Sequence, residues 1–103
     1  MTKITYSRSC EGLHIRAKGH AGYGASGTDI VCSAISILLQ SLVEYALESN
    51  TLEITKLLLS EGNADIDIIG ESECFEMTLI GLEMLAETYP DNVEMVEISQ
   101  EPR

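Results

Sequence analysis

The chain has 103 residues, 45% of them hydrophobic, and its 17 acidic and six basic side chains give a formal net charge of −11. This length and apolar content predict one domain over residues 1–103 with a core large enough to fold without disulfide bonds. The negative charge argues against binding to nucleic acid or an anionic membrane through a basic face, and it favours a basic partner if the partner is charged.

The chain begins with two segments that are expected to form a β-hairpin. Apolar and polar residues alternate over residues 4–8 and again over residues 13–18, with a short glycine-containing turn between them. Over residues 30–47 the apolar side chains recur at helical spacing instead. Thr28 or Asp29 can cap this helix, because either side chain can accept hydrogen bonds from its first free N–H groups.

A second hairpin and a second helix are predicted further along the chain. Residues 52–59 and 64–69 have the pattern of strands around another glycine-containing turn, and residues 75–89 form a helix that ends at Pro90. Residues 93–98 form a last strand before a polar tail. The order ββαββαβ predicts an α+β fold, a two-layer sandwich in which two helices pack on a mixed sheet.

The second predicted helix is apolar on more than one side. Such a helix is either deeply sandwiched in the core or has one face that contacts a partner, and a homodimer is a reasonable expectation for a small domain. Three residues flank its main leucine stripe: Met77, Ile80 and Met84.

The cysteines and the start of the chain indicate a cytoplasmic protein. Cys10, Cys32 and Cys74 form an odd set without CxxC spacing, and the first residues lack the apolar segment of a secretory signal. We therefore expect reduced thiols. The most apolar stretch, residues 30–43, is interrupted by three serines and a glutamine, so no membrane-spanning segment is expected.

Two reactive side chains lie on either side of a glycine-rich loop. His20 follows the second predicted strand, and Cys32 falls near the third position of the first predicted helix. Cysteine and histidine can act as a thiolate nucleophile and its proton acceptor. At a helix start, free N–H groups and the helix dipole favour a thiolate, and the N–H groups of Cys32 and its neighbours can also stabilise an oxyanion.

Helical geometry places Asp29 and Ser36 in the same arc as Cys32. Asp29 can orient the imidazole of His20 or merely cap the helix, and Ser36 can hydrogen-bond near the cysteine or the loop. The competing interpretation is that Cys32 is a packed and inert core residue. The loop contains four glycines, which either supply positive φ angles or let the loop move: Gly19, Gly22, Gly24 and Gly27.

Two other kinds of site are rejected. Residues 22–27 spell the GxGxxG pattern of dinucleotide-binding proteins, but the preceding strand alternates instead of being continuously apolar, and no acidic residue ends a second strand about 20 residues later. The cysteines and histidines lack the paired short spacings of structural zinc sites. We therefore expect no cofactor and no metal, and we expect His14 to be structural or solvated.

The segments Gly19-His20-Ala21 and Asp29-Ile30-Val31-Cys32, together with Gly27 and Ser36, resemble the ribosomal-processing cysteine protease family. Ser33 stands where many relatives carry alanine. The resemblance implies a homodimeric endopeptidase that removes the N-terminal extension of the twenty-seventh large-subunit ribosomal protein. It also implies that Cys32 is the nucleophile and His20 the base, with Gly19, Asp29 and Ser36 as further matching positions.

The resemblance further implies that the glycine-rich loop, with Gly22, Gly24 and Gly27, moves when a peptide substrate enters. A basic ribosomal protein would be attracted by an enzyme of this negative charge. Two alternatives remain. One is a non-enzymatic acidic dimer that binds a basic ribosomal protein or assembly factor, and the other is a redox-sensing thiol protein.

Overall fold

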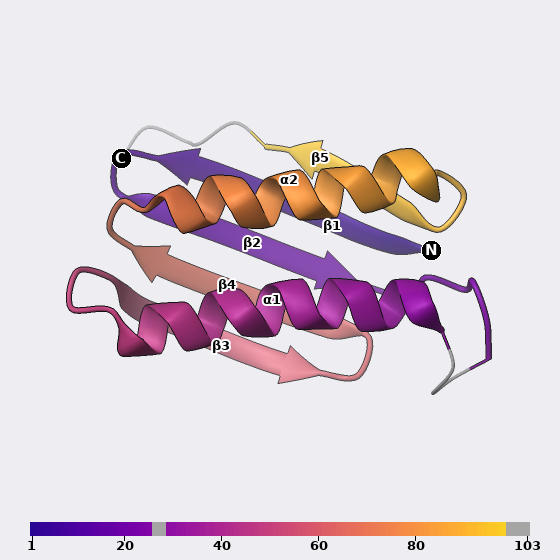
Figure 1. Ribbon diagram of the computed structural model, residues 1–103, viewed down its shortest axis with the longest axis horizontal. Helices are drawn as coiled ribbons and strands as arrows, with labels where there is room; N and C mark the ends of the chain where they lie inside the picture. The colour runs from indigo at the N-terminus through magenta and orange to yellow at the C-terminus, as the bar shows by residue number, and fades with distance from the viewer. Residues whose placement is uncertain (26–28, 99–103) are drawn as a thin grey trace.

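The computed structural model describes residues 1–25 and 29–98, and it consists of a five-stranded sheet with two helices on one face (Figure 1). The ββαββαβ order and the two-layer α+β arrangement predicted from the sequence are confirmed. Gly27, Thr28 and the polar tail lie outside the described residues. The elements are β1 (Thr2–Ser9), β2 (Gly12–Lys18), α1 (Ile30–Glu48), β3 (Glu53–Ser60), β4 (Asn63–Ile69), α2 (Glu73–Thr88) and β5 (Val93–Glu97).

The sheet is mixed and has the strand order β3-β4-β2-β1-β5. The hairpins β1–β2 and β3–β4 are joined by antiparallel pairing of β2 with β4, whereas β5 lies parallel to β1 at the other edge. The glycine-rich loop therefore follows a strand that is antiparallel to both of its neighbours. This topology agrees with the rejection of a dinucleotide-binding loop, which follows a strand of a parallel sheet.

Strand alternation separates an apolar face of the sheet from a polar one, because successive side chains of a strand point to opposite faces. The apolar face lies under the helices, and Ile15 of β2 is paired there with Ile66 of β4, both almost completely buried. Leu42 of α1 and Leu82 of α2 complete this core with 2% and 0% exposure. The opposite face has no helix over it (Figure 1) and carries polar side chains such as His14.

Helix α1 is long and apolar enough to cross a membrane by length and composition alone, with a mean hydropathy of 1.8. The polar interruptions in this stretch therefore do not disqualify it, contrary to the expectation from the sequence. In this fold α1 packs against the sheet and α2, and a core helix passes the same test. Its buried residues are Val31, Ile35, Leu39, Leu42, Val43 and Ala46.

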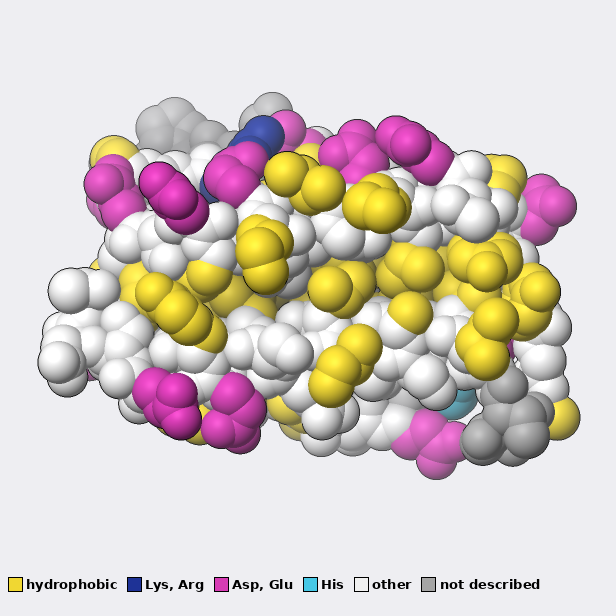
Figure 2. Space-filling view, in the orientation of Figure 1, with side chains coloured by type: hydrophobic (Ala, Val, Ile, Leu, Met, Phe, Trp, Pro, Cys, Tyr) yellow, Lys and Arg dark blue, Asp and Glu magenta, His cyan; other side chains and the backbone are white. Residues whose placement is uncertain are grey.

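The outer surface of the helix pair carries many exposed hydrophobic side chains. Figure 2 shows hydrophobic side chains gathered in a band along the two helices, with acidic side chains on both sides of the band. Met77, Ile80 and Met84 of α2 are 77%, 57% and 62% exposed. The interpretation of α2 as a deeply sandwiched helix is therefore wrong, because one helical layer covers the sheet and the outer side of α2 meets solvent.

Candidate active site

A cavity of about 780 Å³ opens where the β2–α1 loop, the first turns of α1 and the β3–β4 turn meet. Its apolar wall includes Ile35, Ile37 and Leu59, and its polar wall includes Gln40 and Ser60. The fold brings every site residue predicted from the sequence and described in the structure to this cavity. These residues are Gly19, His20, Gly22, Gly24, Asp29, Cys32 and Ser36.

Cys32 is the third residue of α1, and its sulfur receives a hydrogen bond from the preceding loop. The N–H of Ala21 donates to Cys32 Sγ at 3.2 Å, and the carbonyl of Ala21 accepts from Asn92 Nδ2 at 2.9 Å. Ala21 itself is only 1% exposed. Hydrogen bonds at both its N–H and its carbonyl thus fix the backbone at Ala21. The β2–α1 loop supplies the N–H group that donates to the Cys32 sulfur.

The carboxylate of Asp29 joins the loop to the helix. Asp29 caps α1, since its Oδ1 accepts from the N–H groups of Val31 at 2.9 Å and Cys32 at 3.0 Å. Its Oδ2 accepts from Tyr23 at 2.9 Å and Gly24 at 3.3 Å. These N–H groups, with that of Cys32 foremost, hold the pKa of Asp29 below its usual value, against the opposing effect of burial.

This arrangement corrects one expectation about the helix start. The N–H groups of Cys32 and its neighbours were expected to be free, but Asp29 Oδ1 accepts from Val31 and Cys32, and the N–H of Ser33 bonds to the Asp29 carbonyl at 3.1 Å. An aspartate cap accepts hydrogen bonds from the first N–H groups of a helix, which have no partner within the helix itself. The capping role of Asp29 is therefore confirmed. The four N–H groups that donate to its carboxylate belong to the loop and to the helix.

His20 lies beyond the end of β2, and its exposed ring rests against the β3–β4 turn. A Cβ atom at Gly62 would lie 2.9 Å from His20 Nε2, so the ring occupies the space that a side chain would need. Gly62 has a φ of +71°, and its carbonyl accepts from the N–H of Gly19 at 2.9 Å. Although the structure describes both His20 and Cys32, no hydrogen bond joins them.

Several parts of the loop are tied to their surroundings. Gly19 and Gly22 have φ angles of 92° and 72°, which lie in the left-handed region that favours glycine. The φ angle of Gly24 does not lie in this region. The ring of Tyr23 packs edge-on against Tyr89, with a centroid distance of 5.1 Å. Ser36 lies one turn beyond Cys32 on the cavity wall.

Sequence reasoning missed three features. Gly62 was recognised only as part of a turn, and Asn92 was not singled out, because it lies 71 residues from Ala21 in the chain. A titratable cluster of His14, Asp65 and Asp67 on the helix-free face was missed as well. Its signal was the alternation of Asp65 and Asp67 on a strand, which places both carboxylates on one face.

The remaining cysteines lie outside the cavity. Cys10 is an exposed free thiol, and Cys74 is a partly buried free thiol packed against the core. Among the cysteines, only Cys32 lines the cavity with His20.

Comparisons with known proteins bear on this cavity. Residues 1–94 match the model of a family described as cysteine protease Prp. The ribosomal processing cysteine protease Prp of Mycoplasma genitalium is 33% identical over 104 residues, covering 98% of this chain and 100% of that protein. The crystal structure of SMU.848 from Streptococcus mutans is 29% identical with a TM-score of 0.69, and the match covers 97% and 96% of the two chains.

A further solved structure shares the fold. The S. aureus ribosomal processing protease Prp, in complex with a covalently linked product peptide, superposes with a TM-score of 0.83. The match covers 95% of this chain and 100% of that one, at 20% identity. The family match over residues 1–94 and the Mycoplasma genitalium relative decide the assignment. The chain belongs to the cysteine protease Prp family and is a cysteine protease.

Proposed function

We propose that this protease removes the N-terminal extension of the twenty-seventh protein of the large bacterial ribosomal subunit. The Mycoplasma genitalium relative is a ribosomal processing protease, and the S. aureus protein has been crystallised with a substrate peptide. The observation that carries the proposal is that Cys32 and His20, from separate elements, line one open cavity. The net charge of −11 favours the approach of a strongly basic ribosomal protein.

The proposed reaction uses Cys32 as nucleophile and His20 as base. His20 accepts the thiol proton, the Cys32 sulfur attacks the scissile carbonyl, and the same imidazole returns the proton to the leaving amine. A thioester forms, and water deprotonated by His20 hydrolyses it to release the acid. Because no hydrogen bond joins the two side chains in the free enzyme, His20 must approach Cys32 when the peptide is in place.

The cavity suits an extended peptide with apolar side chains. Ile37 of α1 and Leu59 of β3 line it, and Leu59 is 43% exposed. Such surfaces accept apolar side chains of an extended peptide, while the polar groups of Gln40 and Ser60 can bond to its backbone. We infer that the substrate lies between α1 and the β3–β4 hairpin.

The experiment is cleavage of the host ribosomal protein, or of a synthetic peptide across its extension junction, followed by mass spectrometry. Cleavage at one bond is expected, and Cys32→Ala and His20→Ala should abolish it while circular dichroism shows an intact fold. Cys10→Ser is the matched control, because it removes an exposed thiol outside the cavity and should cleave like the unmodified protein.

The outcomes separate the parts of the proposal. Cleavage by Cys32→Ala, or iodoacetamide labelling of Cys32 no faster than that of a free thiol, would overturn the nucleophile assignment. Turnover of other peptides but not of the ribosomal extension would overturn the substrate alone. A stable sulfenic acid at Cys32 without peptide turnover would favour a redox sensor. Family membership favours the enzyme over the non-enzymatic acidic dimer.

We also propose a cytoplasmic homodimer that contacts no nucleic acid directly. Its support is the exposed apolar band along the helices (Figure 2), together with the exposure of Met77, Ile80 and Met84 in α2. Burying such a band against a second copy would remove a large apolar surface from water. Light scattering should give twice the chain mass, and Ile80→Glu should give a monomer. A monomeric unmodified protein at micromolar concentration would contradict this proposal.

A further inference from the structure

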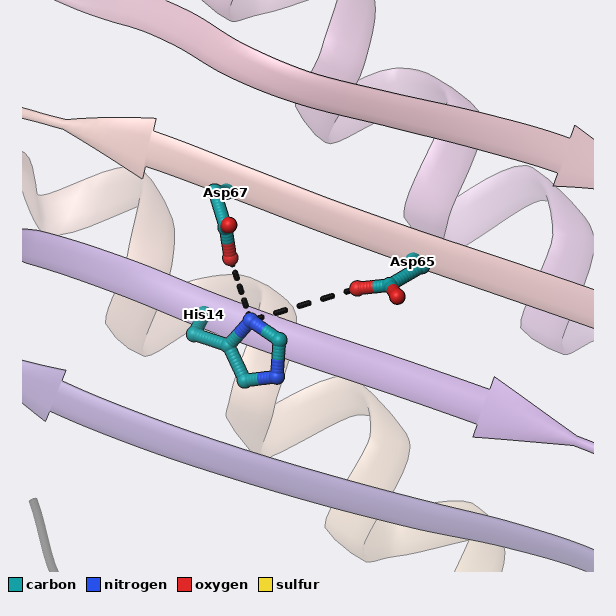
Figure 3. Close-up of side chains that lie close together, drawn as sticks. All are labelled: His14, Asp65 and Asp67. Atoms are coloured by element: carbon teal, nitrogen blue, oxygen red, sulfur yellow. Dashed lines mark hydrogen bonds and ion pairs between the residues drawn. The ribbon is translucent and has the colours of Figure 1, made fainter.

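Three titratable side chains meet on the helix-free face of the sheet, outside the cavity. His14 of β2 lies directly opposite Asp67 of β4, and Asp65 lies two residues along β4 on the same face (Figure 3). His14 Nδ1 contacts Asp67 Oδ1 and lies 4.0 Å from Asp65 Oδ1. One imidazole nitrogen therefore faces two carboxylates, and all three are carried by paired strands.

Asp65 is the unusual member of this cluster. The residue is only 7% exposed, and its Oδ1 is buried without a hydrogen-bond partner within residues 1–25 and 29–98. Its other oxygen, Oδ2, accepts from Lys56 Nζ at 2.9 Å and lies 4.0 Å from Arg16 Nε. A buried carboxylate oxygen is normally hydrogen-bonded or bound to a metal, so Asp65 Oδ1 is the oxygen of this cluster that can accept a further partner.

The carboxylate of Asp65 is in the form that binds cations. Lys56, through its hydrogen bond and its charge, holds the pKa of Asp65 below its usual value, against the opposing effect of burial. Asp65 is therefore ionised at neutral pH. Because Lys56 and Arg16 face Oδ2, Oδ1 is the atom that remains free to complete the cluster.

We propose that His14 Nδ1, Asp65 Oδ1 and Asp67 Oδ1 bind a divalent transition-metal ion such as Zn²⁺. One candidate ligand atom from each of the three residues lies within 4.8 Å of those from the other two. Tetrahedral zinc with ligand distances of about 2.1 Å holds neighbouring ligand atoms about 3.4 Å apart, so small side-chain rotations are sufficient. The imidazole nitrogen selects against Mg²⁺ and Ca²⁺, which prefer oxygen ligands.

The position of the cluster indicates what the ion would do. None of the three residues lines the cavity, so the ion is remote from the proposed peptide chemistry. It would instead connect β2 to β4, the pair that joins the two hairpins of the sheet. The nearby charges of Lys56 and Arg16 would limit its affinity.

The test is calorimetric titration of the full chain with Zn²⁺, together with the absorption spectrum of the Co²⁺ form. One ion per chain is expected, and the cobalt spectrum should lack a thiolate charge-transfer band, since no cysteine belongs to the cluster. His14→Asn and Asp67→Asn should each weaken binding about tenfold or more. His20→Asn is the matched control, because the chain has only these two histidines, and it should bind Zn²⁺ as before.

A second variant tests the role of the neighbouring charge. Lys56→Met removes the cation on Asp65 Oδ2 and should tighten Zn²⁺ binding, with circular dichroism as the check on folding. Any of three results would overturn the proposal and show that the cluster is an ion-pair network without a metal. These are no Zn²⁺ binding below about 1 mM, a thiolate band in the cobalt spectrum, or an equal loss of Zn²⁺ affinity in His14→Asn and His20→Asn.

Discussion

Asn92 holds the backbone that bonds to the Cys32 sulfur, and its removal should affect both stability and cleavage. In Asn92→Ala the carbonyl of Ala21 loses the Nδ2 donor at 2.9 Å. Ala21 is 1% exposed, so water does not readily replace this donor. An unsatisfied buried carbonyl costs about 1–3 kcal/mol, so we expect the free energy of unfolding to fall by that amount.

The same substitution should lower kcat about tenfold. The N–H of Ala21 donates to Cys32 Sγ at 3.2 Å, and a displaced Ala21 peptide moves both this donor and the adjacent His20. Misplacement of reacting groups by about 1 Å can cost a hundredfold in rate, so a smaller shift predicts a smaller loss. Urea denaturation and peptide cleavage measure the two effects, with Asn50→Ala at an exposed site as control.

The outcome that would refute this reasoning is a variant with normal cleavage and a loss of less than about 0.5 kcal/mol, within the range of ordinary surface substitutions. A second variant separates donor loss from volume loss. Asn92→Asp keeps the side-chain shape but places a carboxylate oxygen against the Ala21 carbonyl, so it should be at least as damaging as Asn92→Ala. If Asn92→Asp were neutral, the hydrogen bond to Ala21 would have no role.

Three further predictions concern the core, the histidine and the helix cap. Leu82→Ala, at a position with 0% exposure, should lower the free energy of unfolding by about 2–5 kcal/mol in urea. Gly62→Ala places a Cβ 2.9 Å from His20 Nε2 and should lower kcat several-fold; unchanged kinetics would show that the resting position of the ring is unimportant. Because the folded pKa of Asp29 is lowered, its carboxylate stabilises the fold above about pH 4 and this contribution is lost as pH falls through the folded pKa. The stability difference between Asp29→Asn and the unmodified protein should therefore shrink from pH 7 towards pH 2.

The secondary structure could be predicted because its signals are local. Alternation over residues 13–18 predicted a strand that is observed as Gly12–Lys18, and the periodicity from Ile30 predicted a helix that is observed as Ile30–Glu48. Asp29 was identified as a possible cap from its place before the first apolar residue. These signals depend on residues that are close together in the sequence, so no knowledge of the tertiary fold was needed.

The contacts that shape the site could not be predicted in the same way. The pairing of β2 with β4 brings together strands separated by a whole helix and a third strand, and it alone places Asp65 and Asp67 beside His14. The contact of His20 with Gly62 likewise depends on how the two hairpins meet. A single sequence contains no signal of which distant segments will pair, so these neighbours appear only in the fold.

The bonds around the loop indicate which part of the site is free to change. Ala21 is fixed by Asn92 and by the Cys32 sulfur, and the backbone after it is tied to Asp29 at Tyr23 and Gly24. The exposed ring of His20 is instead held by packing against the β3–β4 turn. Rotation of this one side chain breaks none of the hydrogen bonds at Ala21, Tyr23 and Gly24, whereas movement of the whole loop breaks several. The distance between His20 and Cys32 can therefore change through His20 alone while the backbone at Ala21 stays beside the sulfur.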